Sequence, residues 1–135
     1  MPVNIIHIED GGIIFKCEAV VTGQELKETN KMIYKSTDDI KKILYQIVDT
    51  IDASDVSVSR DEMEGIAMLD KKAFEINPHM LIALVANNDL YFGLCRMWES
   101  FATDLPTKTM VFRKMEDAQQ WIREELQKKS SLFDN

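Results

Sequence analysis

The stretch His79–Asp89 reads HMLIALVANND and decides the expected fold. Apolar residues follow one another from Met80 to Ala86 without polar alternation. Because a strand with one solvated face alternates apolar and polar residues, this stretch predicts a strand that is covered on both faces. Helices on both faces of a largely parallel sheet are the usual cover, so the stretch indicates an α/β domain.

The composition fits one folded domain. The chain has 135 residues, of which 45% are hydrophobic and 29% are charged, which suits a single core and argues against disorder. The formal net charge of −7 argues against nucleic-acid binding, because phosphate contacts need clustered lysine and arginine. No stretch is long and apolar enough for a signal peptide or a membrane span. We therefore expect a cytoplasmic protein without membrane insertion.

Short polar segments separate the expected elements. Asp10-Gly11-Gly12 predicts a hairpin turn, because glycine readily adopts the positive φ that such turns need. Thr22 with Glu25, and Ser59 with Glu62, form capping boxes that start two helices. The expected strands are residues 4–9, 13–21, 43–49, 79–86 and 108–114. The expected helices are residues 22–35, 60–74, 89–102 and 116–129. Residues 36–42 are expected as a charged connection or a continuation of the first helix, and residues 50–58 as a polar loop. This gives the order β-β-α-β-α-β-α-β-α, with residues 1–129 as a single domain and residues 130–135 as a flexible tail.

Three segments carry a resemblance to a known family. They are VVTGQEL at Val20–Leu26, ALVANNDLYF at Ala83–Phe92 and MEDAQQWI at Met115–Ile122. In order and spacing they resemble the SpoIIAA-like family, also called STAS-like domains, over nearly the whole chain. The resemblance implies a βα superhelix with a mixed five-stranded sheet and about four helices.

The resemblance also implies a class of function. The better understood relatives are anti-sigma-factor antagonists, which bind partner proteins and are switched by phosphorylation of a serine at the start of a helix. In this chain, Ser57 and Ser59 lie in the corresponding region and are the phosphorylation candidates. The segment reads DASDVSVSR, in place of the Asp-Ser-Ser-Gly-like signature of those relatives.

The helix that follows the polar turn after residue 86 is the strongest candidate for a contact surface. Its apolar positions form two adjacent stripes, which is wider than one buried face needs. Such surplus aromatic residues form a partner-binding surface or line an apolar pocket, and the alternative is a helix packed into a crowded corner of the core. The candidates are Asn87, Asn88, Asp89, Tyr91, Phe92, Trp98 and Phe101.

An acidic loop offers a different class of function. Asp49, Asp52 and Asp55 are three residues apart, and carboxylates at the end of a strand are suitable ligands for Mg²⁺ in a metal-dependent enzyme. Aspartates in loops more often close turns on backbone N–H groups. We therefore expect no metal site, no cofactor and no catalytic residues. The leading hypothesis is a non-enzymatic regulatory or interaction domain that binds a protein partner, which includes a second copy of the chain, or a small apolar ligand.

Overall fold

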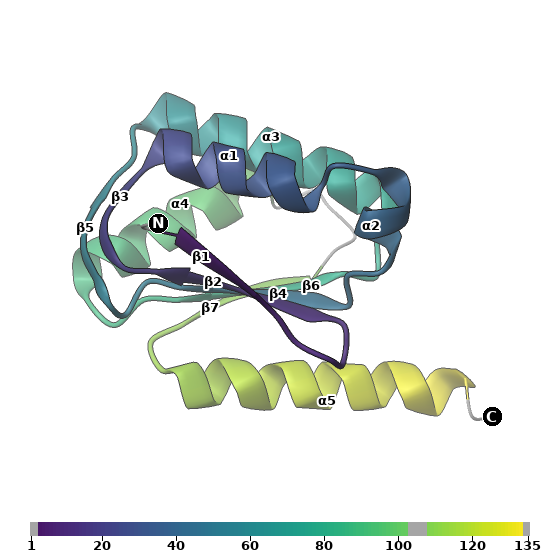
Figure 1. Ribbon diagram of the computed structural model, residues 1–135. Helices are drawn as coiled ribbons and strands as arrows, with labels where there is room; N and C mark the ends of the chain where they lie inside the picture. The colour runs from purple at the N-terminus through teal and green to yellow at the C-terminus, as the bar shows by residue number, and fades with distance from the viewer. Residues whose placement is uncertain (1–2, 103–107, 134–135) are drawn as a thin grey trace.

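The computed structural model describes residues 3–102 and 108–133. Within them, the chain forms seven strands and five helices (Figure 1). The strands are β1 (Val3–His7), β2 (Gly12–Cys17), β3 (Ala19–Thr22), β4 (Tyr45–Asp49), β5 (Ala53–Ser57), β6 (Leu81–Val85) and β7 (Lys108–Phe112). The helices are α1 (Gly23–Ile33), α2 (Thr37–Lys41), α3 (Arg60–Ile76), α4 (Asp89–Phe101) and α5 (Met115–Phe133). No helix in the described part of the chain is long and apolar enough to cross a membrane.

The main sheet has five strands in the order β1-β2-β4-β6-β7. β1 and β2 pair antiparallel, and every other neighbouring pair is parallel. The predicted hairpin turn between β1 and β2 is confirmed: Gly11 has a φ of 96°, and the Gly12 amide donates to Oδ1 of Asp10 at 3.1 Å. The mixed sheet therefore matches the expected architecture.

Helices cover both faces of this sheet. Figure 1 shows α1, α3 and α4 on one face and α5 alone on the other. The central strand β6 serves both layers, because its residues alternate between two hydrophobic clusters. Ile82 and Leu84 belong to the cluster under α1, α3 and α4, whereas Ala83 and Val85 belong to the cluster under α5. The prediction of a strand covered on both faces is confirmed.

A two-stranded ribbon was not expected from the sequence. β3 and β5 pair in parallel as a separate sheet, which rises from the main sheet toward the helices (Figure 1). Residues 13–21 were predicted as one strand, but the strand is interrupted at Glu18, and Ala19, the first residue of β3, has a left-handed φ of 55°. Residues 50–58 were predicted as a loop, but five of them form β5. The ribbon leads directly into α1 and α3.

Several predicted boundaries also change. α2 is a separate short helix whose N-cap, Ser36, accepts a hydrogen bond from the amide of Asp39, so residues 36–42 do not continue α1. α3 ends at Ile76, two residues later than predicted. α5 ends at Phe133, so residues 130–133 are helical, although they were expected in the tail.

The predicted helix caps are confirmed. Thr22 and Glu25 form a reciprocal capping box at the start of α1, and Ser59 and Glu62 form one at the start of α3. At α4, the side chain of Asn88 accepts from the amide of Tyr91 at 2.8 Å. Each cap fixes the direction in which a helix leaves the strand before it.

Candidate functional site

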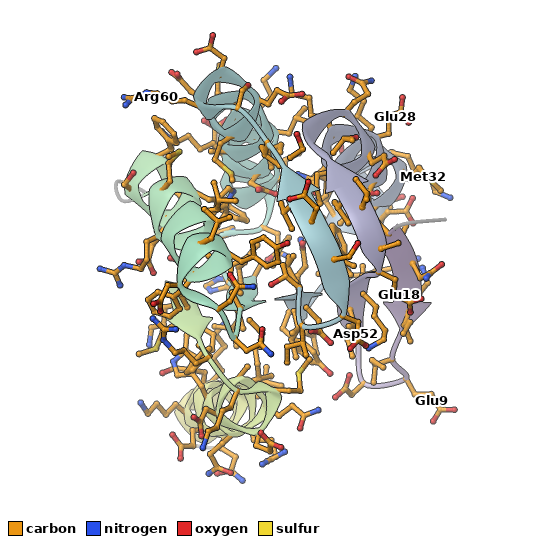
Figure 2. All side chains as sticks on the ribbon, turned by 90° about the vertical axis from the view of Figure 1, so that its left-hand side faces the viewer. Glu9, Glu18, Glu28, Met32, Asp52 and Arg60 are labelled. Atoms are coloured by element: carbon orange, nitrogen blue, oxygen red, sulfur yellow. The ribbon has the colours of Figure 1, made fainter. Side chains whose placement is uncertain are left out.

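A cavity of about 80 Å³ lies inside the core, between the main sheet and the helices α1, α3 and α4. Its wall is almost entirely apolar and includes Phe15 from β2, Leu84 from β6 and Cys95 from α4. Val56 of β5 and Leu94 of α4 also line it, and both are only half-buried. The outer end of the cavity therefore lies between the ribbon and α4, the side that Figure 2 turns toward the viewer.

A buried carboxylate stands in the wall of this cavity. Asp70 of α3 is 5% exposed and receives three hydrogen bonds from side chains. Oδ1 accepts from the Tyr34 hydroxyl at 2.8 Å and from Nδ2 of Asn30 at 3.3 Å, while Oδ2 accepts from Nε1 of Trp98 at 2.9 Å. The carboxylate thereby joins α3 to the C-terminal end of α1 and to α4.

The surroundings of Asp70 act on its pKa in opposite directions. Burial raises the pKa of Asp70 to about 7, while the hydrogen bonds from Tyr34 and Trp98 oppose that rise. Burial disfavours the charged carboxylate, whereas donors aimed at its oxygens favour it. Near neutral pH, both forms of Asp70 are therefore populated. Such a perturbed group in a cavity is typical of functional sites.

The network continues from Asp70 to the sheet. The Tyr34 hydroxyl, which donates to Asp70, accepts from Nε2 of Gln46 at 2.6 Å. Gln46 lies on β4 and is 2% exposed. The pKa of Tyr34 is raised well above its usual value, chiefly by burial. Its hydroxyl proton therefore stays in place for the bond to Asp70.

Two thiols also line the cavity. Cys17 of β2 and Cys95 of α4 are buried and free. Burial raises the pKa of each thiol to about 12, so both are protonated and unreactive at neutral pH. They act as small apolar wall residues.

The predicted contact residues of α4 fall into two groups, those that line the cavity and those that lie outside it. Tyr91 and Trp98 are 6% and 5% exposed, so these two candidates do not lie on an exposed surface. α4 packs against α3 and the sheet at once, and this arrangement buries the stripe that contains Tyr91 and Trp98, whereas the stripe of Leu94 and Phe101 is only half-buried. Tyr91 and Trp98 do line the cavity, which is the pocket alternative that the sequence left open.

The remaining α4 candidates lie outside the cavity. Phe92 is half-buried beneath the guanidinium of Arg113, which lies 4.2 Å from its ring centroid and pairs with Asp89 at 2.8 Å. Phe101 is half-buried, with the guanidinium of Arg60 5.5 Å from its ring centroid. The exposed residues at the start of the helix are Asn87, Asn88 and Asp89, of which Asn88 is the cap.

A lysine pairs with two of the three aspartates of the acidic loop. Nζ of Lys16 lies 2.8 Å from the carboxylate of Asp52 and 3.6 Å from that of Asp49, and Asp49 also closes a turn on the amide of Ile51. Asp55 lies on β5, where it is opposite Val20 of β3. Within residues 3–102 and 108–133, no group of three or more His, Cys, Asp or Glu side chains could hold a metal ion. The loop therefore does not offer the three-carboxylate site that the enzyme alternative requires.

The phosphorylation candidates lie at the surface, at the start of α3. Ser57 ends β5, opposite Thr22 of β3, and it is exposed. Ser59 is exposed too, but its hydroxyl accepts from the Glu62 amide as the helix cap. Asp61 and Glu62 make the first turn of this helix acidic.

A second hollow opens at the other end of the fold. It has a volume of about 360 Å³ and lies between the β1–β2 hairpin and the α1–α2 segment. Its wall mixes charged side chains such as Lys35, Asp39 and Lys42 with apolar ones. None of the charged or polar side chains that the described residues contribute to its wall is buried, in contrast to Asp70 in the cavity. The interior cavity is therefore the better candidate site.

Of this network, sequence reasoning named Trp98 but missed Asp70, Asn30, Tyr34 and Gln46. A signal was present, because Asp70 lies on the helical stripe of Met63, Ala67 and Phe74, where spacings of three and four predict apolar residues. Gln46 gives the same signal in β4, as the polar residue of an otherwise apolar strand segment. A charged or amide side chain in a core position usually has buried partners.

Comparison with known proteins identifies the fold. No family model and no curated protein matches the sequence. Among solved structures, the unphosphorylated anti-sigma factor antagonist SpoIIAA matches with a TM-score of 0.60 and 10% sequence identity, over 90% of this chain and 97% of that chain. The chain has the SpoIIAA-like fold. Phosphorylated SpoIIAA, a Bacillus cell fate determinant, matches with a TM-score of 0.59 and 9% identity, over 89% of this chain and 98% of that one.

The SpoIIAA-like fold confirms the resemblance that the sequence suggested. The match covers both the sheet and its helices, although the sequences share few residues. At this level of identity, the comparison establishes the fold alone. The cavity and the carboxylate in its wall are features of this chain's own residues.

Proposed function

We propose that this protein is a small regulatory or interaction domain that binds a small apolar ligand inside its fold. The observation that carries the proposal is the cavity of about 80 Å³ with a nearly continuous apolar wall. Protein cores contain few voids larger than a water molecule. An engineered apolar cavity of roughly 150 Å³ stays dry and binds benzene or xenon, so the smaller volume here suits a ligand of a few heavy atoms.

An empty cavity of this size has a cost. At the rate measured for engineered cavities, it lowers the free energy of unfolding by about 2 kcal/mol. An occupant that fills the cavity would recover part of this energy. It would touch the ribbon through Val56 and α4 through Leu94, and in this way it would couple two surface elements to ligand binding.

The fold supports a regulatory role. SpoIIAA is described as an anti-sigma factor antagonist, and such a protein acts on another regulatory protein. In the present chain, the ribbon that walls the cavity leads into α1 and α3. A ligand that stiffens the ribbon would therefore change the surface at the start of both helices.

Xenon tests the proposal, because it is a neutral probe that enters apolar cavities. We expect xenon pressure to shift the indole N–H signal of Trp98 in a ¹H–¹⁵N NMR spectrum in a saturable way. The replacement Leu94→Trp at the outer end of the cavity removes this shift. The matched control is Leu90→Trp on the same helix, because Leu90 is 66% exposed and is absent from the cavity wall. A wild-type protein that shows no saturable shift, or equal shifts in both variants, contradicts the proposal.

A serine switch is the second candidate, and the exposure of Ser57 at the end of β5 favours it. A phosphate at the start of α3 would meet the favourable end of the helix dipole and the unfavourable charges of Asp61 and Glu62. Intact-mass measurement of protein from its native cell tests this candidate. A mass increase of one phosphate that disappears in Ser57→Ala supports it, and an unmodified wild-type mass argues against it.

A further inference from the structure

We infer that the cavity takes a small apolar amine, whose ammonium group pairs with the carboxylate of Asp70 while its hydrocarbon part fills the apolar space. This inference rests on the proposed function and narrows it to one chemical class. It depends on three observations: the position of Asp70, the donors that surround it, and the absence of a cation beside it.

Asp70 is one of the residues that line the cavity. Its side chain is part of the wall, although the residue is only 5% exposed. Leu84 and Ile82 of β6 and Leu94 of α4 belong to the same wall. The wall also includes the polar residues Asn30, Gln46 and Thr50, and Asp70 is the one carboxylate among the lining residues.

The three partners of Asp70 are arranged around an acceptor. The Trp98 indole can only donate. The Tyr34 hydroxyl accepts from Gln46, so its own proton is directed to Asp70. Two oxygens of an ionised carboxylate offer about four acceptor directions, of which these donors and Asn30 take three. Among the hydrogen bonds of the described residues, Oδ1 receives two donors and Oδ2 one, which leaves one direction on Oδ2 for a further donor.

No cation among residues 3–102 and 108–133 pairs with the ionised carboxylate. No ion pair among the described residues involves Asp70. The causes that act on its pKa are burial and two hydrogen bonds, with no cation among them. A buried charge is expensive unless it is paired as well as hydrogen-bonded. The structure therefore supplies the donors for an anion and lacks its positive partner.

An ammonium group meets both needs. It supplies a donor for the free direction and the positive charge that the site lacks. The aromatic wall residues Phe15, Tyr91 and Trp98 also suit a cation near their rings. A neutral alcohol supplies the donor without the charge, and a carboxylate ligand brings a second negative charge that Asp70 would repel.

Three probes of nearly equal size separate these cases: butylamine, butan-1-ol and butyrate. Each is titrated into the millimolar range against the wild-type protein at pH 8, with the Trp98 indole signal as the readout. We expect butylamine to bind at least about tenfold more tightly than butan-1-ol, and butyrate to bind most weakly. Equal affinity for the amine and the alcohol, or tighter binding of butyrate, overturns the inference.

The pH dependence gives a second test. An amine that pairs with ionised Asp70 binds about tenfold more tightly at pH 8 than at pH 6, because the ionised fraction rises through the pKa near 7. The other titratable groups around the site are Cys17 of β2, Tyr34 after α1, and Tyr91 and Cys95 of α4. Burial raises the pKa values of Cys17, Tyr34 and Cys95, which keeps these three groups neutral in this range. An affinity for butylamine that does not change between pH 6 and pH 8 contradicts the inference.

Variants assign the preference to Asp70. Asp70→Asn should lose the preference for butylamine over butan-1-ol, while Asp61→Asn, which changes an exposed carboxylate on the same helix, should keep it. If Asp70→Asn does not fold, the comparison of the three probes on the wild-type protein still tests the inference. If xenon occupies the cavity but butylamine has no advantage, this inference is wrong and the proposed function stands. If xenon also fails to bind, both are wrong.

Discussion

The indole nitrogen of Trp98 lies 2.9 Å from a carboxylate oxygen of Asp70 and joins α4 to α3 through the core. This bond places a charged acceptor beside an apolar cavity, where solvent does not screen it. The same two residues therefore contribute to the packing of the helices and to the candidate site. Their chemistry gives predictions for stability as well as for binding.

Trp98→Phe removes the donor to Oδ2 and keeps most of the aromatic volume. Leaving a buried acceptor unsatisfied costs about 1–3 kcal/mol, and the loss should be larger at pH 8 than at pH 5 because Asp70 is ionised at the higher pH. Urea unfolding at the two pH values measures the effect. Trp121→Phe is the control, since Trp121 lies on α5 and packs against Phe112 on the opposite side of the sheet. Similar losses in the two variants at both pH values would show that only ring volume matters.

Asp70 should make the fold less stable as the pH rises. Its folded pKa of about 7 lies above the unfolded value near 3.9, so the folded state holds the proton more tightly. The resulting stability is fully present below about pH 4, declines as the pH rises and is lost above about pH 7. The full difference is about 4 kcal/mol.

The stability of Asp70→Asn relative to the wild type isolates this effect from other titrating groups. Between pH 4 and pH 8, the free energy of unfolding of the wild type should fall by several kcal/mol relative to that of the variant. Denaturant unfolding of both proteins across this range checks it. A constant difference between the two proteins would mean that Asp70 has an ordinary pKa.

The two cysteines should be protected from thiol reagents in the folded protein. Their burial raises the pKa of each to about 12, and the thiolate is the reactive form. With Ellman's reagent at pH 8, we expect almost no reaction of native protein and two thiols per chain in denaturant. Rapid reaction of one thiol in the native protein would indicate that the cavity opens to solvent.

Ala19 should be a point of backbone strain. Its φ of 55° costs roughly 1–2 kcal/mol for a residue with a Cβ, so Ala19→Gly should equal or exceed the wild type in stability, and Ala19→Val should be less stable. The neighbouring replacement Val20→Gly is the control, because glycine weakens a strand. Thermal unfolding of the three variants gives the order, and a stabilising Ala19→Val would contradict the assigned conformation.

The sequence predicted the layers well because they depend on repeated patterns. The unbroken apolar run that contains β6 required cover on both faces, and the capping boxes at Thr22 and Ser59 located the starts of α1 and α3. The ribbon was missed because β5 reads ASDVS, a polar segment whose pairing with β3 depends on a contact distant in sequence. The left-handed turn at Ala19 gave no signal either, since alanine rarely adopts it.

The candidate site was predicted only in part. The aromatic surplus on α4 indicated a pocket or a surface, and the packing of three helices on one face of the sheet buries Tyr91 and Trp98 in the pocket wall. The carboxylate could have been found as the charged residue on the apolar stripe of α3. Its partners could not, because Asn30, Tyr34 and Trp98 come from two other helical segments. Only the tertiary fold brings them to one point.

The central claim is that the space beside Asp70 and Trp98 is a ligand site. A crystal of the protein under xenon pressure tests it most directly, because the anomalous signal of xenon locates each bound atom. We predict a xenon atom in contact with the side chains of Leu84, Cys95 and Trp98. Xenon found only at surface positions such as Leu90 or Met68, or no bound xenon at all, would contradict the account.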